Sequence, residues 1–255
     1  HPGARRLESA AAPGRARGIR GRGGVPEFGY ALSMDGDVNG DGFRDLVIGA
    51  PGDDQAGPSA GRVFVSLGGH GLHEKPDFEC ASGRPHSQFG IAVTDGVDIN
   101  GDGIADIAVG ANWDDTDGPY AGAVYLFHGG AHPDGTPDLV LHGPGESAWF
   151  GTVLAGGADL DGDGDRDLVV SSLHRGGLVD GAGSVEIYRG GPHFTQNAWK
   201  RLRGGDRYDE FGGSFGAADV NGDGHTDLIV GEHYHSRSGR TQGAIDGFFG
   251  GPAMD

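Results

Sequence analysis

The sequence predicts an all-β fold, a β-propeller of four-stranded antiparallel blades, and three observations carry this prediction. Sequence landmarks repeat four times with a period of about 61 residues. Each repeat contains short β-branched runs bounded by turn residues, as strands do. The 54 glycines among the 255 residues follow no three-residue period, so they indicate many tight turns rather than a collagen-like chain.

Three independent landmarks define the repeat. Phe-Gly pairs begin at residues 28, 89, 150 and 211, and acidic loops begin at residues 37, 98, 159 and 219. The third landmark, a short apolar run that closes on Gly-Gly, begins at Gly61, Gly122, Gly183 and Gly243. We therefore expect four blades, over residues 27–87, 88–148, 149–209 and 210–255.

Within each unit, four strands are expected. The stretch "FGIAV" places Phe89, Ile91 and Val93 on alternate positions, which is the period of a half-buried strand. A second strand is expected in "DLVIGA", "DIAVGA", "DLVVSS" and "DLIVGE", and a third in "RVFVSL", "AVYLFH" and "SVEIYR". A less regular fourth stretch is "DFECAS", "DLVLHG" or "WKRLRG", and it contains Cys80, which we expect to be a buried, unreactive thiol. A parallel β-helix would use much shorter repeats.

The N-terminal region is expected to supply one further strand. The stretch "RGIRGRGGVPEFG" (residues 17–29) aligns without gaps on "KRLRGGDRYDEFG" (residues 200–212), whereas the fourth unit ends without its own fourth strand. We therefore expect residues 17–21 to pair with the fourth unit and close the ring, which would remove two exposed edges. If the ring does not close within one chain, we expect pairing into a homodimer. Residues 1–16, a basic leader rich in Gly, Ala and Arg, are expected to be disordered.

Each unit carries an acidic loop whose spacing suits a hard cation. In "DVNGDGFRD", oxygen-bearing side chains occupy positions 1, 3, 5 and 9, position 7 offers its backbone carbonyl, and two glycines permit a sharp turn. Calcium takes roughly six to eight oxygen ligands, whereas magnesium needs a strict octahedron and zinc or iron would want thiolate or clustered imidazole. The four loops therefore predict up to four calcium ions, with the ligands Asp37, Asn39, Asp41, Phe43, Asp45, Asp98, Asn100, Asp102, Ile104, Asp106, Asp159, Asp161, Asp163, Asp165, Asp167, Asp219, Asn221, Asp223, His225 and Asp227.

These motifs together resemble a known family. A Phe-Gly pair, the pattern D-x-[DN]-x-D-G-x-x-D and the "GAP" of residues 49–51 are similar to the FG-GAP repeat of integrin α-subunit propellers. Similar repeats occur in bacterial secreted integrin-like proteins and in a glycosylphosphatidylinositol-specific phospholipase D. The resemblance implies calcium in the acidic loops and a ligand-binding face opposite them. Two features depart from the family: "GAP" becomes "GAN", "SSL" and "GEH" in later units, and integrin propellers have seven blades whereas four units are present.

The most variable connections follow the second expected strand of each unit: "PGDDQAGPSA", "NWDDTDGPYA", "LHRGGLVDGA" and "HYHSRSGRTQ". On a propeller they gather on the face that the resemblance assigns to ligand binding. Aromatic side chains beside charged ones suit recognition of a protein or a glycan. The candidates for this face are Trp113, Asp114, Asp115, Tyr120, His174, Arg175, His233, Tyr234, His235 and Arg237.

The charge balance excludes nucleic acid and anionic membranes as partners. The chain has a net charge of −18, and beyond the six arginines of residues 1–24 it holds 13 Lys and Arg against 36 Asp and Glu. No stretch approaches the roughly 18 apolar residues of a membrane span. With one cysteine, the chain has no internal disulfide.

Two functions from different classes fit these features. The first is a calcium-binding, integrin-like propeller that acts as an extracellular or secreted adhesion module for a protein or glycan. Carboxylate loops of this kind fill most easily where calcium is millimolar. The alternative is a non-catalytic propeller module of a larger secreted enzyme of the phospholipase or hydrolase kind. No catalytic residues are expected, because the sequence has neither a G-x-S-x-G elbow nor an H-E-x-x-H helix, and His233 and His235 alone are weak evidence for a metal.

Overall fold

The structure is a computed structural model, and it describes residue 19 and residues 25–69, 75–173, 181–205, 209–237, 240–252 and 254. The strands of these residues form four antiparallel sheets, numbered 1 to 4 here in chain order. A 3₁₀ turn spans Gly191–His193, and the described residues contain no α-helix. The predicted all-β fold class is confirmed.

In sheets 1 to 3, four strands pair in chain order. Sheet 1 contains β1 (Leu32–Ser33), β2 (Leu46–Ala50), β3 (Arg62–Ser66) and β4 (Phe78–Cys80). Sheet 2 contains β5 (Ala92–Val97), β6 (Asp106–Ala111), β7 (Ala123–Phe127) and β8 (Leu139–His142). Sheet 3 contains β9 (Phe150–Ala158), β10 (Asp167–Ser172), β11 (Ser184–Tyr188) and β12 (Lys200–Arg203).

Sheet 4 has three strands among the described residues. It pairs β13 (Phe211–Ala218) with β14 (Asp227–Glu232), and β14 with β17 (Ala244–Phe248). A small hairpin of β15 (Ser236–Arg237) and β16 (Arg240–Thr241) lies within the connection between β14 and β17. The strands coincide with the runs expected from the sequence, and the fourth sheet shows the expected lack of an outer strand.

The core lies between consecutive sheets. Alternate residues of β2, such as Val47, face sheet 2, where they meet Val109 and Tyr125 in one buried cluster. Similar clusters fill the spaces between sheets 2 and 3 and between sheets 3 and 4. Because each inner sheet is covered on both faces, its central strands are buried along almost their whole length rather than on alternate residues. Cys80 is part of the first cluster, so its expected burial is confirmed, and burial raises the pKa of its thiol to about 12, which disfavours the reactive thiolate.

The Phe-Gly pair joins each sheet to the one before it. Phe89, Phe150 and Phe211 are at most 1% exposed, and each is wedged into the cluster between its own sheet and the preceding sheet. Phe89 also forms a parallel bridge with Gly61 of sheet 1, as Phe150 does with Gly122. In sheet 2 the regular strand therefore begins at Ala92, after the Phe-Gly pair, and not at Phe89 as the alternating pattern suggested.

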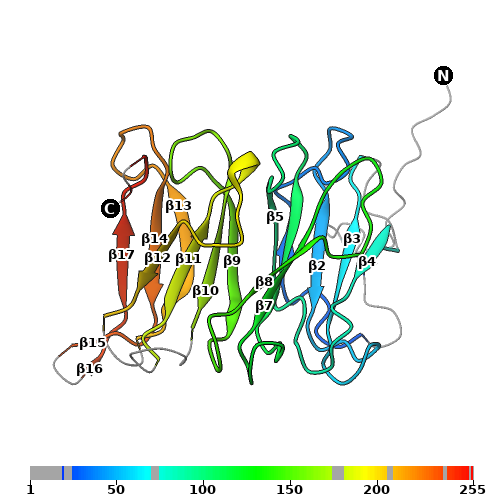
Figure 1. Cartoon of the computed structure of the whole chain (residues 1–255), viewed down its shortest axis with the longest axis horizontal. Helices are drawn as coiled ribbons and strands as arrows, with labels where there is room; N and C mark the ends of the chain where they lie inside the picture. Colours follow the sequence, from blue (N-terminus) through cyan, green and yellow to red (C-terminus); the bar gives the residue numbers. More distant parts are fainter. Residues whose placement is uncertain are drawn as a thin grey trace, which may run out of the picture.

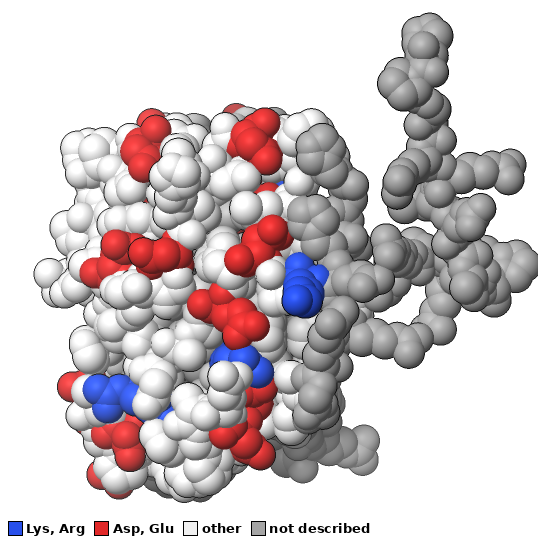
Figure 2. All heavy atoms as spheres, turned by 90° about the vertical axis from the view of Figure 1, so that its right-hand side faces the viewer, with Lys and Arg blue, Asp and Glu red and all other residues white. Residues whose placement is uncertain are grey.

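The four sheets stand in a row and do not close into a ring (Figure 1). Sheet 1 lies at one end of the row and sheet 4 at the other, with β17 on the outer side of sheet 4. Seen from the sheet 1 end, acidic side chains are spread over the surface and basic ones form only a few separate spots (Figure 2). The described residues on this side form no continuous basic surface that would attract phosphate groups.

The expectation that residues 17–21 close the ring lies mostly outside the described residues. The described residue Ile19 packs with Val25 and Phe28 against Ile48 and Phe64 on the outer face of sheet 1. That face is apolar and would otherwise meet water, which gives the N-terminal residues a reason to cover it. For Ile19, the expected place against sheet 4 is therefore wrong. The leader of residues 1–16 also lies outside the described residues.

Candidate metal centres and binding face

The four acidic loops lie at the same end of the strands in all four sheets. Each connects the first strand of its sheet to the second, as the loop from Asp37 to Asp45 connects β1 to β2. The variable connections follow the second strand and therefore lie at the opposite end, where the β15–β16 hairpin is seen in Figure 1. The arrangement separates a repeated acidic end from a variable end.

Position 9 of each loop is a buried carboxylate that ties the loop to the rest of its sheet. Asp45 is 1% exposed and accepts hydrogen bonds from the backbone N–H of Val38 and of Gly68, both at 2.7 Å. The second of these donors lies 23 residues later, in the Gly-Gly that follows the third strand. The same pair of bonds recurs at Asp106, Asp167 and Asp227. A carboxylate oxygen keeps a second lone pair after one such bond, so position 9 retains capacity for a cation.

Positions 1, 3 and 5 fold the loop around their own side chains. In the second loop, Asp98 accepts the N–H of Gly101 at 2.8 Å and of Gly103 at 2.8 Å. Asn100 accepts the N–H of Asp102 at 2.9 Å, and Asp102 accepts the N–H of Ile104 at 2.8 Å. These bonds fold a tight turn around the side-chain oxygens of the odd positions, and oxygen is the atom type that a calcium ion takes as ligand.

Position 7 joins two of the three pairs of consecutive loops. Ile104 of the second loop packs against Gly40 of the first, and His225 of the fourth packs against Gly162 of the third. A side chain on Gly162 would crowd His225, whereas one on Gly40 would make an ordinary contact with Ile104. Phe43 of the first loop has no preceding loop to meet and is 55% exposed.

The electrostatics of the loops leave negative charge without a countercharge. Burial raises the pKa of Asp45, Asp106 and Asp167, although backbone hydrogen bonds act in the opposite direction. For Asp167 the pKa rises to about 7, and the neighbouring Asp161 and Asp163 contribute to the increase. A divalent cation would stabilise the ionised form of each of these groups. The donor set is oxygen throughout, so the residues present fit calcium.

The third loop is the most acidic and also holds a competing cation. Oxygens of Asp159, Asp161 and Asp167 lie within 4.8 Å of one another. The guanidinium Nε of Arg189 lies 2.6 Å from Asp161 Oδ2, and the guanidinium stacks on the ring of Trp199 at 4.7 Å. Arg189 follows β11, at the position that Leu67 occupies after β3 in sheet 1. In this loop a metal ion would have to share Asp161 with Arg189 or displace it.

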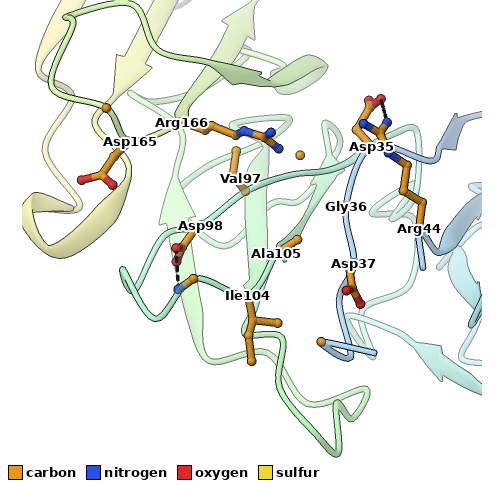
Figure 3. A pocket seen from close by; sticks show the side chains of 14 residues that line it. Asp35, Gly36, Asp37, Arg44, Val97, Asp98, Ile104, Ala105, Asp165 and Arg166 are labelled. Atoms are coloured by element: carbon orange, nitrogen blue, oxygen red, sulfur yellow. Dashed lines mark hydrogen bonds and ion pairs between the residues drawn. The ribbon is translucent and has the colours of Figure 1, made fainter. Parts of the chain in front are cut away.

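A hollow opens among the first three loops. Its volume is about 420 Å³, and its walls include Asp37 and Arg44 of the first loop, Asp98 of the second, and Asp165 and Arg166 beside one another in the third (Figure 3). Arg44 lies 3.6 Å from Asp35 across an exposed ion pair. The hollow is thus lined by both signs of charge and brings acidic loops of three sheets to one space.

At the opposite end, the expected binding-face residues divide into several groups. Trp113 and Tyr120 stack edge to face at 5.8 Å, Tyr120 is 50% exposed, and Asp115 is exposed. His233 and Tyr234 are exposed as well, and Arg237 lies in β15. His174 and Arg175 lie outside the described residues. The sequence therefore located exposed aromatic groups in sheets 2 and 4, and the structure places them on the same end of the molecule.

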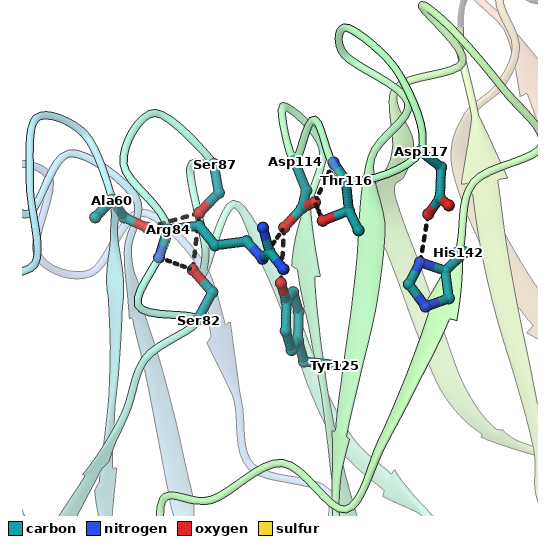
Figure 4. Close-up of polar contacts among 9 residues, drawn as sticks. All are labelled: Ala60, Ser82, Arg84, Ser87, Asp114, Thr116, Asp117, Tyr125 and His142. Atoms are coloured by element: carbon teal, nitrogen blue, oxygen red, sulfur yellow. Dashed lines mark hydrogen bonds and ion pairs between the residues drawn. The ribbon is translucent and has the colours of Figure 1, made fainter.

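Asp114 has a different environment from its neighbours. Its carboxylate is 1% exposed, accepts the hydroxyl hydrogen bond of Tyr125 at 2.7 Å, and bonds with Thr116 (Figure 4). Arg84, from the connection between sheets 1 and 2, reaches it at 3.7 Å. We interpret Asp114 as a link between sheets rather than a ligand contact. Sequence reasoning missed Arg84 and Tyr125. Arg84 comes from the first unit and reaches Asp114 of the second, and Tyr125 lies on β7, the strand that follows Asp114 in the chain.

His235 also faces inward. Its ring lies beside Asp209 and Glu232, neither of which the sequence analysis singled out. The replacement of "GAP" by "GEH" in the fourth unit was the one signal that could have pointed to Glu232.

Comparisons with known proteins agree with the repeat. The model of the FG-GAP repeat matches residues 28–66 and 89–127, and the model of the FG-GAP-like repeat matches residues 159–230. Human integrin alpha-6 is 39% identical over 174 residues, which cover 68% of this chain and 14% of that protein. Rat integrin alpha-7 is 40% identical over 152 residues (57% of this chain, 13% of that protein), and Drosophila melanogaster integrin alpha-PS2 is 39% identical over 160 residues (57% and 11%). The matched region is thus a small part of each of these relatives.

Proposed function

The chain belongs to the FG-GAP repeat family and contains an integrin-like propeller module, and from this premise we propose that it is a calcium-stabilised binding module that acts outside the cell. The observation that carries the proposal is the fourfold recurrence of one loop. In each copy, a buried carboxylate such as Asp106 ties the turn to the end of the third strand, and oxygen donors fill positions 1, 3 and 5. We take residues 27–87, 88–148, 149–209 and 210–255 as the four blades of this module.

Calcium would be held by side-chain oxygens of positions 1, 3, 5 and 9 and by the carbonyl of position 7. The ion supplies positive charge that the loops otherwise lack. The chain's own residues supply the frame: position 9 holds each loop to its sheet, and position 7 packs on the preceding loop in the second and fourth loops. Stability would then depend on calcium concentration, because the folded state binds the ion and the unfolded chain does not.

The test is a calorimetric count of bound calcium, with thermal melts in chelator and in about 1 mM calcium, a concentration typical of extracellular sites. We expect up to four ions per chain and a melting temperature that rises with calcium. Asp102→Ala removes an exposed position-5 ligand and should lower the count by one. Asp115→Ala, an exposed aspartate at the opposite end, is the matched control and should leave it unchanged. An unchanged count and melting temperature in calcium would refute the metal proposal.

The variable end is proposed to bind a protein or a glycan. Support comes from the Trp113–Tyr120 pair and from Tyr234, which expose aromatic surface beside charged groups. The probes are an array of immobilised glycans and a panel of immobilised extracellular proteins. A double replacement of Trp113 and Tyr120 by Ala should abolish a specific signal, whereas Tyr30→Ala, an equally exposed tyrosine outside the variable connections, should retain it. A signal that survives the double replacement would place binding elsewhere.

Action outside the cell is part of the same proposal. It rests on the oxygen-only loops, which suit millimolar calcium, and on the similarity to integrin alpha subunits. Among the described residues, no helix has the length and apolarity to span a bilayer. The alternative, a module of a larger secreted enzyme, would be favoured by a catalytic domain in the same reading frame.

We also propose that the outer face of sheet 4 takes sheet 1 of a second copy of the chain. Residues Val169 and Val185 on the corresponding face of sheet 3 are at most 2% exposed under sheet 4, whereas Ile245, which matches Val185, is 76% exposed. A β-carbon on Gly183 would meet the backbone of Phe211 in the next sheet, whereas at Gly243 the nearest atom would be 3.3 Å away. Phe28 is the one Phe of the four that is not fully buried. The half-buried Phe28 at one end is thus proposed to pack against the exposed face of sheet 4 in a second copy, and two copies would close a ring.

Sedimentation of the whole chain tests this pairing. We expect a species of twice the 26.1 kDa chain mass. Ile245→Asp should shift it to the monomer, because it places a charge in the contact without burying it in the folded monomer. Tyr120→Asn, a change at another exposed side chain whose φ of 55° suits Asn, should remain dimeric. A wild-type chain that sediments as a monomer would assign the face to a different partner and overturn the proposal.

A further inference from the structure

A cluster of metal-binding side chains lies in sheet 4, apart from the acidic loops. Glu232 is the last residue of β14, His235 follows it across a turn, and Asp209 precedes β13. The two segments are joined by their backbones, because the N–H of Tyr234 donates to the carbonyl of Asp209 at 3.1 Å. The cluster is at the end of β14 opposite the fourth acidic loop.

The three side chains converge on one point. His235 Nδ1 lies 2.8 Å from Glu232 Oε2 and 3.4 Å from Asp209 Oδ2, and one ligand atom of each residue falls within 4.8 Å of the others. Asp209 is completely buried, Glu232 is 6% exposed, and the side chain of His235 is 30% exposed. One side of the group is therefore accessible to an entering ion.

This cluster replaces a different arrangement in the earlier sheets. Position 232 corresponds to Ala50 and Ala111, and position 235 corresponds to Asp53 and Asp114. In sheet 1, Arg62 lies 2.8 Å from the carboxylate of Asp53. In sheet 2, the carboxylate of Asp114 accepts a hydrogen bond from Tyr125 and forms an ion pair with Arg84. Sheet 4 has an imidazole at position 235, and at position 232 it has a carboxylate where sheets 1 and 2 have a methyl group and sheet 3 has Ser172. The same scaffold thus holds a nitrogen and two oxygen donors.

We propose that Asp209, Glu232 and His235 bind a divalent transition-metal ion of the zinc class, at a site separate from the calcium loops. Imidazole nitrogen with carboxylate oxygens is a donor set that suits zinc, nickel or copper and disfavours calcium, which takes oxygen alone. Bonds of about 2.0–2.1 Å in a tetrahedron separate ligand atoms by roughly 3.3 Å. The 3.4 Å between His235 Nδ1 and Asp209 Oδ2 matches this separation, and the 2.8 Å to Glu232 would lengthen slightly.

The charges around the cluster support the assignment. The carboxylates of Asp209 and Glu232 are both buried, and Asp246 on β17 adds a further negative charge that acts on Glu232. The site therefore concentrates negative charge that a divalent ion would neutralise. Three protein ligands leave a fourth position for water or for a group of a bound partner.

His233 provides a matched control two residues away. Its ring packs over Gly213, where a β-carbon would approach it closer than 3.0 Å, and it is not among the three converging side chains. Sequence reasoning could pair His233 with His235 as metal ligands. The structure instead pairs His235 with two carboxylates. Replacement of His235 should therefore weaken zinc binding, whereas replacement of His233 should leave it unchanged.

The experiment uses the whole chain saturated with calcium, so that the acidic loops are not available to the added metal. Titration with zinc against a chromophoric chelator should show one site per chain. His235→Ala and Glu232→Gln should each weaken zinc binding at least about tenfold, since even partners of a ligand contribute that much. His233→Ala should bind zinc as the wild type does. In cobalt(II)-loaded protein, the visible spectrum of a low-symmetry nitrogen and oxygen site should be lost in His235→Ala and retained in His233→Ala.

Each other outcome overturns the proposal. Calcium-saturated chain that binds no zinc, or His235→Ala that binds it unchanged, would leave the cluster as an ion-paired histidine. Equal weakening by His233→Ala would assign the metal to the His233–His235 pair. Melting temperatures in chelator show whether each variant is folded. If His235→Ala does not fold, Glu232→Gln, which conserves the shape of the side chain, still tests the proposal.

Discussion

Gly61 lies so close to Phe89 that a β-carbon on Gly61 would be less than 3.0 Å from the Phe89 carbonyl oxygen. The two residues are joined by a parallel bridge, as are Gly122 and Phe150, and the same close approach recurs between Gly183 and Phe211. Two of the sequence landmarks, the Phe-Gly pair and the glycine that opens the third strand, are thus the two halves of one contact between sheets. Their common period follows from that contact.

Gly122→Ala should therefore destabilise the chain far more than Gly243→Ala. Both glycines have positive φ, 79° and 68°, which costs an alanine about 1–2 kcal/mol. At Gly243 the nearest atom is 3.3 Å from the new β-carbon, whereas at Gly122 the backbone of Phe150 is in the way. Adding overpacking of about 1–3 kcal/mol, we expect a loss of roughly 3 kcal/mol or more for Gly122→Ala. Denaturant unfolding of both variants measures the difference, and equal losses would show that the contact is not tight.

Arg189→Gln should strengthen calcium binding at the third loop. Arg189 is paired with Asp161, and the ion must compete with that pair. A partly exposed ion pair is worth about 0.2–1 kcal/mol, so the gain should be about two- to fivefold in affinity. Calorimetry on the whole chain measures it. Arg201→Gln, which removes a guanidinium that pairs with Glu186 away from the loops, should have no effect.

Asp114→Ala should destabilise the chain without removing any exposed group. Its carboxylate is buried and bonds with Tyr125 and Thr116, and its loss would leave the Tyr125 hydroxyl without this acceptor. We expect a decrease of about 2–4 kcal/mol in the free energy of unfolding. Asp115→Ala, at an exposed neighbour, should change it by less than about 0.5 kcal/mol. If the two variants unfold alike, Asp114 does not link the sheets.

Asp95→Asn should make the chain more stable at neutral pH and remove part of its pH dependence. Asp95 is completely buried, bonds with the Ser33 hydroxyl and accepts the N–H of Asp35 at 2.9 Å. Burial raises its pKa. An acid with a raised folded-state pKa adds stability below its unfolded-state pKa of about 3.9, and that stability is lost as pH rises through the folded-state value.

The difference between Asp95→Asn and the wild type should therefore be largest at pH 7 and shrink as the pH is lowered. Thermal melts of both proteins from pH 7 down to about pH 4, near the unfolded-state value, measure it in excess calcium, because calcium keeps the loop carboxylates ionised in both. A difference that does not vary with pH would mean that Asp95 has no raised pKa.

The sequence by itself determined the repeated unit. Strand positions, the all-β class and the acidic loops follow from local spacing, since the period of side chains along a strand and the turn chemistry of Asp, Asn and Gly act within a few residues. Even the contact between Gly61 and Phe89 is visible in the sequence, because both residues recur with the same period along the chain. The same local spacing gave the positions of the loop oxygens, and it made calcium the expected ion.

The tertiary structure decided what joins different units. From the sequence, Asp114 cannot be told from its exposed neighbour Asp115; the structure shows that Arg84 and Tyr125 surround Asp114. Likewise, the sequence pairs His235 with His233, whereas the structure places His235 beside Asp209 and Glu232. Ile19 matched a strand of sheet 3, yet it packs on sheet 1. Burial and charge at these residues depend on groups brought together from distant parts of the chain, and no local pattern encodes which groups those are.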